Sequence, residues 1–275
     1  MAKPFDLTDG SVTLDRRLDL IPSRDPRNAA FPMRLLLQPR PLRVWSWPNK
    51  VQLDQGDLGG CAAYASCHEL SAVPIEQTDV GDELATSVYF SAQRRDGLPG
   101  GEYPGAFPRA GGTTLEAVAK DLKRRGRITG YYWAEGPHDV YQCVAWERPV
   151  VVGTPWTEAM MQPDANHMLH PDGRGLGGHA WLIRRIDPAR RLLGMQNSWG
   201  RQWGDNGGAW MAFEDFERLW AQNGQAVVLV DNPTPPPEAR VERPVGWIGW
   251  IKHLFARART ERNRRCGLTP LRFSR

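Results

Sequence analysis

The stretch from Gln55 to Ala65, which reads QGDLGGCAAYA, constrains this 275-residue chain more than any other. Cys61 follows a glycine-rich run that forms helix poorly, and it opens an apolar segment that we predict to be a helix ending near Ser71. A thiol at a helix N-terminus meets unpaired backbone N–H groups and the positive end of the helix dipole, which favour the thiolate. Gln55 lies close enough upstream to offer its side-chain amide as a second donor. We therefore expect the chemistry of the protein to take place here.

The composition is that of a folded globular protein, with 41% hydrophobic and 24% charged residues. The length allows one large domain or two lobes, and the 28 glycines and 23 prolines predict a loop-rich chain rather than a helical bundle. The N-terminus lacks the apolar core of a signal peptide, and no apolar run has membrane-spanning length. The spacing of the four cysteines suggests neither a disulfide framework nor a zinc site: Cys61, Cys67, Cys143 and Cys266. We expect a reducing, cytoplasmic compartment and no metal or cofactor, with export that uses no cleaved signal as the alternative.

Helical patterns dominate the first half of the chain and strand patterns the second, which predicts an α+β fold of two lobes. We expect helices at 61–71 and 85–94, and a third that starts at Thr113 in a capping box with Glu116 and stops at Gly126. The expected strands are 149–153, 179–183, 191–197, 209–213 and 226–230, with a short helix at 213–220.

The chain divides into four segments by composition. Residues 1–43 are irregular and proline-dotted and predict an extended arm, and residues 44–230 form the main domain. Residues 231–243 are a proline-rich linker, and residues 244–275 are a basic, amphipathic tail. Net charge is +6 from Asp231 onward and −2 before it. The tail either packs back on the body or docks on an acidic partner, a nucleic acid or a membrane surface.

A cysteine nucleophile needs a base and a group that orients the base. Of six histidines, His179 is the best candidate, because Gly177 and Gly178 precede it and an apolar strand follows it. Asn197 ends the next expected strand. Two sequential strands joined by a short turn usually pair, so we expect His179 and Asn197 to lie within reach of each other.

Three motifs together resemble the papain-like cysteine peptidases. The stretch 55–65 resembles the QGxCGSCWAFA segment of that family, and Gly178-His179-Ala180 resembles its histidine strand. The residues NSWGRQWG, which start at Asn197, match its NSWGxxWG segment, and the three motifs occur in the family's order. The resemblance covers about residues 44–230 and looks closest to stand-alone bacterial or phage members. It implies a helical N-terminal lobe and a β-rich, antiparallel barrel-like C-terminal lobe, with the active site between them.

The resemblance also assigns roles to individual residues. Cys61 would be the nucleophile, and His179 its base and later the acid for the leaving amine. Asn197 would hold the imidazole ring. Gln55 would stabilise the oxyanion with its side-chain amide, together with the backbone N–H of Cys61.

Three further positions also match the family, the glycine pair more loosely than Trp199, and two depart from it. Trp199 would shield the His–Asn hydrogen bond, and Gly111 and Gly112 resemble the glycine pair that binds extended peptide. Leu58 replaces a disulfide cysteine that the family often has, which agrees with a reducing compartment. Ala62 replaces the tryptophan that usually follows the nucleophile. The first 43 residues are too short and too proline-rich to resemble the family's long helical inhibitory propeptide.

The resemblance implies a cysteine endopeptidase that cleaves polypeptides through an acyl-thioester on Cys61. One alternative is an acyltransferase or amidase that uses the same triad. Another is a catalytically silent binding or scaffold protein that docks through its basic tail. An activated thiolate would make Cys61 react with alkylating reagents faster than the other cysteines do.

Overall fold

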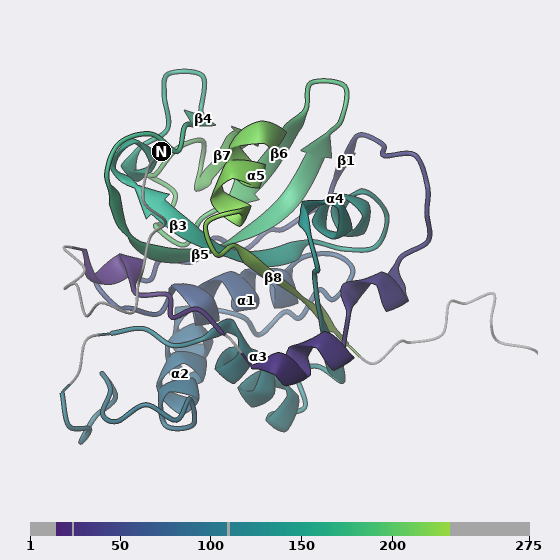
Figure 1. Ribbon diagram of the computed structural model, residues 1–275. Helices are drawn as coiled ribbons and strands as arrows, with labels where there is room; N and C mark the ends of the chain where they lie inside the picture. Colours follow the sequence, from purple (N-terminus) through teal and green to yellow (C-terminus); the bar gives the residue numbers. More distant parts are fainter. Residues whose placement is uncertain (1–14, 24, 109–110, 232–275) are drawn as a thin grey trace, which may run out of the picture. The chain divides into compact units, whose positions relative to one another are not determined.

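The computed structural model describes residues 15–23, 25–108 and 111–231 (Figure 1). The proline-rich linker beyond Asp231 and the basic tail lie outside these residues. The helices are α1 (Cys61–Ser71), α2 (Asp82–Gln93), α3 (Leu115–Arg124), α4 (Pro137–Trp146) and α5 (Phe213–Trp220). The strands are β1 (Trp45–Ser46), β2 (Gly130–Trp133), β3 (Val150–Thr157), β4 (Met168–Leu169), β5 (Gly175–Asp187), β6 (Leu192–Gln196), β7 (Gly208–Ala212) and β8 (Gln225–Val230). The expected α+β class is confirmed, and no helix in this part of the chain is long and apolar enough to cross a membrane.

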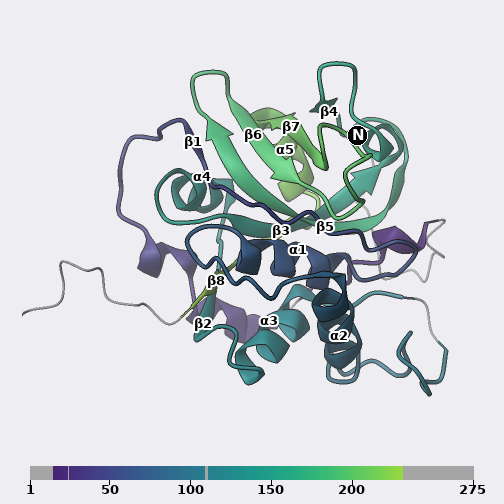
Figure 2. The same ribbon diagram turned by 180° about the vertical axis from the view of Figure 1, so that it is seen from behind.

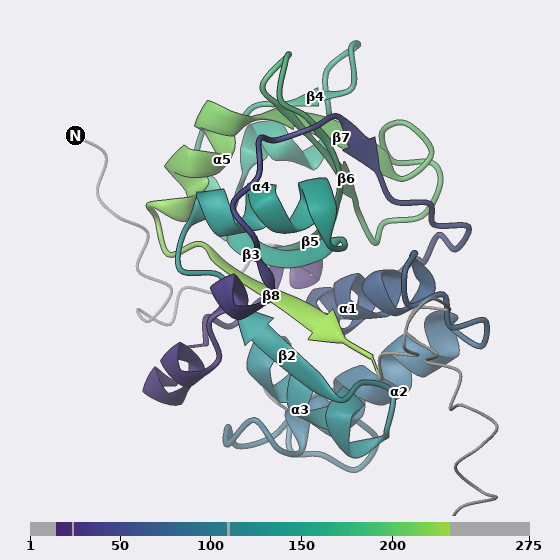
Figure 3. The same ribbon diagram turned by 90° about the vertical axis from the view of Figure 1, so that its right-hand side faces the viewer.

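All eight strands belong to one sheet. Its order is β2-β8-β3-β5-β6-β7-β4, and β1 pairs with β5 off this path. The pairing is antiparallel except between β4 and β7, which run parallel. Strands β2 and β8 lie side by side at one end of the sheet (Figure 3). Among the described strands β2 and β4 do not pair with each other, so the sheet stays open and the barrel-like detail of the prediction is not supported.

The central strands are apolar on both faces, because helices cover the sheet on each side. Along β3, Val150 and Val152 belong to one hydrophobic core, and Val151 between them belongs to the other. Helices α1, α2 and α3 pack against the second core, and α4 and α5 against the first (Figures 1 and 2). The run of valines that marked this strand in the sequence therefore serves two cores at once.

Helix α3 begins one residue later than predicted. Thr114 is its N-cap, and the Thr114 hydroxyl accepts a 3.0 Å hydrogen bond from the backbone N–H of Ala117. Thr113, which we expected to be the cap, is fully buried and donates its hydroxyl to Asp96 instead. The helix ends as predicted near Gly126, whose φ of +71° lies in the left-handed region that glycine tolerates.

The part of the N-terminal arm that the structure describes, residues 15–23 and 25–43, contains three 3₁₀ turns, at Arg16–Leu18, Pro26–Ala30 and Met33–Leu36. The side chains of Leu18 and Met33 are fully buried in the first hydrophobic core. The described part of the arm is thus packed into the main domain.

Candidate active site

Cys61 is the first residue of α1, and Gly60 is the N-cap. Its side chain is fully buried, and its sulfur interacts with the backbone N–H of Ala180, the residue that follows His179. Burial raises the pKa of the Cys61 thiol to about 12, and the N–H groups of Ala180 and of the helix start oppose that rise. Burial and the helix terminus thus act on the pKa of this thiol in opposite directions.

His179 and Asn197 lie together, as the strand pairing predicted. Strands β5 and β6 are antiparallel neighbours, and Asn197 directly follows β6. Nε2 of His179 lies 2.7 Å from Oδ1 of Asn197, and that oxygen also accepts the backbone N–H of Ser198 at 2.8 Å. The amide oxygen only accepts, so this contact needs a proton on Nε2. The carbonyl oxygen of Arg17, 3.3 Å from Nδ1, also only accepts, and a neutral ring can donate to one of these two oxygens only. The shorter contact favours the proton on Nε2, which is the tautomer that a base needs.

Indole rings enclose the imidazole. The ring centroid of Trp199 lies 4.9 Å from that of His179, and the ring centroid of Trp156 lies 4.7 Å from it. Burial lowers the pKa of His179 to about 4, although the hydrogen bond to Asn197 acts in the opposite direction. Trp199 and Trp156 thus both lie against the imidazole ring, and a shielding role for Trp199 stays a prediction. No role was predicted for Trp156, whose only signal in the sequence was its place just after an apolar run.

Gln55 is held from both ends of its side-chain amide. Its Oε1 accepts a 2.6 Å hydrogen bond from the hydroxyl of Ser198, and its Nε2 donates to the carbonyl of Leu58 at 2.7 Å. The backbone N–H of Gln55 also donates to the carbonyl of Ser198 at 2.9 Å. The sequence analysis gave Ser198 no role, although it lies inside the NSWG motif.

His68 is a second residue that the sequence did not single out. It lies on α1, two turns after Cys61, and its fully buried ring accepts the backbone N–H of Leu53 on Nε2 at 3.0 Å. Burial lowers the pKa of His68 to about 3, so the ring is neutral and remains an acceptor. This contact ties the loop before Gln55 to the helix that carries the cysteine.

Gly111 and Gly112 face the N-terminal arm. A Cβ atom added to Gly112 would collide with the carbonyl oxygen of Asp19, and one added to Gly111 would collide with the Asp19 carboxylate. Asp19 itself forms a parallel bridge with Gly178. The glycine pair thus accommodates a closely approaching backbone, here that of the arm.

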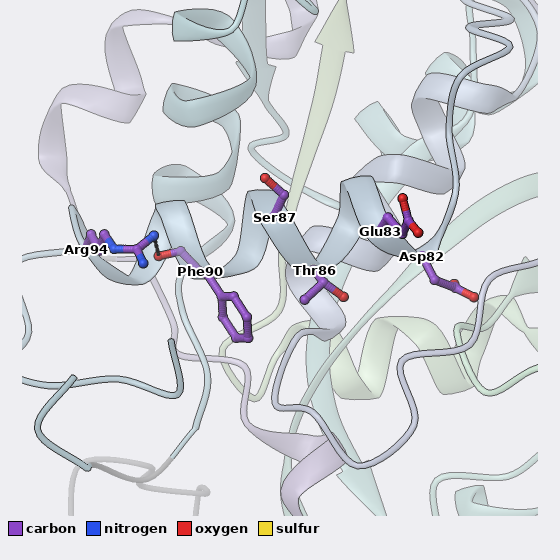
Figure 4. Close-up of a pocket in the computed structure, with 6 residues that line it drawn as sticks. All are labelled: Asp82, Glu83, Thr86, Ser87, Phe90 and Arg94. Atoms are coloured by element: carbon purple, nitrogen blue, oxygen red, sulfur yellow. Dashed lines mark hydrogen bonds between the residues drawn. The ribbon is translucent and has the colours of Figure 1, made fainter. Parts of the chain in front are cut away.

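A separate open hollow of about 540 Å³ lies along α2 (Figure 4). Its lining contains none of the candidate catalytic residues: Asp82, Glu83, Thr86, Ser87, Phe90 and Arg94. Within it, the Arg94 side chain donates to the carbonyl of Phe90 at 3.4 Å. The candidate chemistry therefore does not lie in this hollow.

Comparison with known proteins assigns the fold. No model of a known protein family matches the sequence, and no curated protein matches it. Solved structures do match, and the chain has the fold of papain-like cysteine proteases. Xylellain, a cysteine protease from Xylella fastidiosa, is 18% identical with a TM-score of 0.55, and the match covers 79% of this chain and 93% of xylellain.

Two other solved structures are similar to a comparable degree. Procathepsin B S9 from Trypanosoma congolense is 14% identical with a TM-score of 0.54, over 79% of this chain and 87% of that one. The ragweed pollen cysteine protease Amb a 11, in its proform, is 16% identical with a TM-score of 0.53, over 72% and 69%. These similar structures come from a bacterium, a plant and a trypanosome, so they do not confirm the bacterial or phage type that the motifs suggested.

Proposed function

We propose that this protein is a cysteine endopeptidase with Cys61 as nucleophile, His179 as base and Asn197 as orienting group. The observation that carries the proposal is the fixed His179–Asn197 pair, whose neighbouring residue Ala180 directs its backbone N–H at the Cys61 sulfur. The fold of known cysteine proteases supports the same conclusion. The proposed substrate is a polypeptide.

The geometry supports a two-step acyl transfer. His179 takes the Cys61 proton through Nδ1, and the thiolate attacks the peptide carbonyl. The Gln55 amide and the backbone N–H of Cys61 stabilise the oxyanion, and His179 then gives its proton to the leaving amine. Water hydrolyses the thioester by the same sequence in reverse.

A matched pair of cysteine variants tests the proposal. Cys67 lies on the same helix and is equally buried, so Cys67→Ala controls for the loss of a buried thiol. Cys61→Ala should abolish hydrolysis of a denatured protein substrate, whereas Cys67→Ala should retain it at equal thermal stability. Hydrolysis that survives in a folded Cys61→Ala protein would exclude this nucleophile.

The same triad would serve an acyltransferase or amidase, and product analysis separates these reactions. With an added amine, a transferase gives the amide product in preference to the free acid. A protein that folds, exposes Cys61 to alkylation and yields neither product would instead be a silent binding protein. Docking of the basic tail on an acidic partner, a nucleic acid or a membrane surface remains a separate proposal, because the tail lies outside the described residues.

A reducing, cytoplasmic compartment is also part of the proposal. Cys61, Cys67 and Cys143 are free thiols in the part of the chain that the structure describes. Cys67 and Cys143 are fully buried in the two cores, which agrees with thiols that are kept reduced.

A further inference from the structure

Three hydrogen-bonded side chains, which we call the tyrosine cluster, contact the loop that precedes Cys61. Tyr89 and Gln93 lie one turn apart on α2 and are 0% and 1% exposed, and Glu102 comes from the loop after that helix. The Tyr89 hydroxyl donates to Oε2 of Glu102 and accepts a 2.8 Å hydrogen bond from Nε2 of Gln93. The backbone N–H of Glu102 donates to Oε1 of Gln93 at 2.8 Å, so the three residues close a ring of hydrogen bonds.

The tyrosine cluster holds one peptide group of the loop before Cys61. Oε2 of Glu102 accepts the backbone N–H of Gly59 at 3.1 Å. The carbonyl of the same peptide group belongs to Leu58, and it accepts the 2.7 Å hydrogen bond from Nε2 of Gln55. Because a peptide group is planar, these two bonds fix its orientation from opposite ends. Rotation of this peptide group would remove the acceptor that orients the proposed oxyanion donor.

The tyrosine cluster also holds the second residue of the glycine pair. The backbone N–H of Gly112 donates to the Tyr89 hydroxyl at 2.9 Å, and the carbonyl of Gly112 accepts a hydrogen bond from Nε2 of Gln93 at 3.0 Å. Both polar groups of this glycine therefore contact the cluster, which anchors the segment that the motifs associate with peptide binding.

The two anchored segments touch each other. A Cβ atom added to Gly59 would lie 2.6 Å from the backbone nitrogen of Gly112 and 3.0 Å from the Tyr89 hydroxyl oxygen, so the absence of a side chain permits this approach. Leu58 stands where the family often has a disulfide cysteine, and the cysteines that the structure describes are free thiols. In the described part of the chain, hydrogen bonds and not a disulfide therefore connect the loop before Cys61 to the glycine pair.

We propose that Tyr89, Gln93 and Glu102 are positioning residues, which fix the oxyanion donor and the glycine pair relative to each other. The inference rests on the proposed function, because it adds residues to the same reaction. These side chains act through Gln55 and Gly112. Stabilisation of an oxyanion requires donors that are oriented before the reaction, and a buried, mutually bonded network keeps them oriented without a covalent link.

The first test removes one buried hydroxyl at a time. Tyr89→Phe should raise KM for a peptide substrate about fivefold, the factor typical of one lost hydrogen bond, because Gly112 loses its anchor. Tyr64→Phe is the matched control: Tyr64 is 2% exposed in the same hydrophobic core, and its hydroxyl lies 2.8 Å from that of Thr86. This control should change neither KM nor kcat.

The second test concerns the peptide group between Leu58 and Gly59. Glu102→Ala frees its N–H and should lower kcat about tenfold, less than the roughly 10²–10³-fold loss expected when an oxyanion donor is removed. Glu102→Gln keeps an acceptor oxygen and should retain most of kcat. Tyr89→Phe should lower kcat less than Glu102→Ala does. Wild-type kcat and KM in folded Tyr89→Phe and Glu102→Ala proteins would overturn the proposal.

Amide hydrogen exchange measured by NMR separates this proposal from the peptidase itself. The N–H of Gly59 should exchange faster in Glu102→Ala and that of Gly112 faster in Tyr89→Phe, and neither should change in Tyr64→Phe. Hydrolysis that requires Cys61 but is unchanged in both cluster variants would refute the positioning role and uphold the peptidase. The expected exchange pattern in a protein whose wild type hydrolyses no peptide would refute the peptidase and uphold the cluster as the link between the two segments.

Discussion

The hydroxyl of Ser198 donates a 2.6 Å hydrogen bond to Oε1 of Gln55. Since Gln55 is the proposed oxyanion donor, this bond fixes which end of its amide faces the substrate. The serine is 1% exposed and comes from the same segment as Asn197. The group that orients the base and the group that orients the oxyanion donor are therefore consecutive residues.

Ser198→Ala should lower kcat more than it changes KM. Without the serine hydroxyl, the Gln55 amide would be free to rotate. The resulting decrease in kcat should be smaller than the roughly 10²–10³-fold decrease expected for Gln55→Ala. Steady-state kinetics on Ser198→Ala and the wild type measures both parameters. In a Gln55→Ala background, Ser198→Ala should have little further effect, because the two residues act as one unit. Additive losses would contradict this coupling.

Alkylation of Cys61 should depend steeply on pH in the resting protein. Because burial raises the thiol pKa to about 12, the thiolate fraction, and with it the labelling rate, should rise about tenfold per pH unit between pH 7 and 10. Stopped-time iodoacetamide labelling followed by mass spectrometry measures the slope. A labelling rate that stays constant between pH 7 and 10 would contradict a raised thiol pKa.

Acid should destabilise the protein partly through His68. Its folded pKa of about 3 lies below its ordinary value of 6.5, so between these values the unfolded chain binds a proton that the folded chain does not. The free energy of unfolding contributed by this group is complete above pH 6.5 and falls by about 1.4 kcal/mol per pH unit below it. Urea unfolding from pH 7 to 4.5 measures that slope.

The matched control for this slope is another histidine. In His68→Gln the free energy of unfolding should depend less steeply on pH, because the contribution of this one histidine is removed. His138→Gln replaces an exposed histidine and should not change the slope. Some pH dependence of the free energy of unfolding should remain in His68→Gln, because burial also lowers the pKa of His179 to about 4. Identical slopes in all three proteins would refute this assignment.

The cap of α3 gives a stability test. Thr114→Ala removes the hydrogen bond to the N–H of Ala117 and should lower the free energy of unfolding by about 1 kcal/mol. Thr114→Ser keeps the hydroxyl and should retain most of the free energy of unfolding that Thr114→Ala loses. Chemical denaturation measures both, and a neutral Thr114→Ala would show that the cap contributes nothing here.

Elements with a regular pattern were predicted well from the sequence. The bounds of α1 and α5 agree with the prediction. Strands β3, β5 and β8 are longer than predicted, β6 is shorter, and β7 is shifted by one residue. Helix α4 and strand β2 were not predicted, because they lie in a stretch interrupted by Gly136 and Pro137 where no single period dominates. The predicted cap was wrong by one residue: only Thr113 has the capping-box spacing to Glu116, but its hydroxyl is buried and bonded to Asp96, so the neighbouring Thr114 caps the helix.

The candidate site was predictable where it depends on side chains, and not where it depends on the backbone. The motifs placed His179 beside Asn197, and the strand pairing brought them together. The group that fills the site is the carbonyl of Arg17, and every residue type has the same carbonyl. Arg17 lies 38 positions before Gln55 and 162 positions before His179 in the sequence, so no residue pattern could indicate its contacts with them.

The two hydrophobic cores are joined directly beside the proposed chemistry. Asp54 bridges Trp199, and the next residue, Gln55, exchanges both backbone and side-chain hydrogen bonds with Ser198. The loop that carries the proposed oxyanion donor is therefore bonded directly to the segment that carries Asn197. A substitution that displaces either segment should change the positions of both proposed groups together.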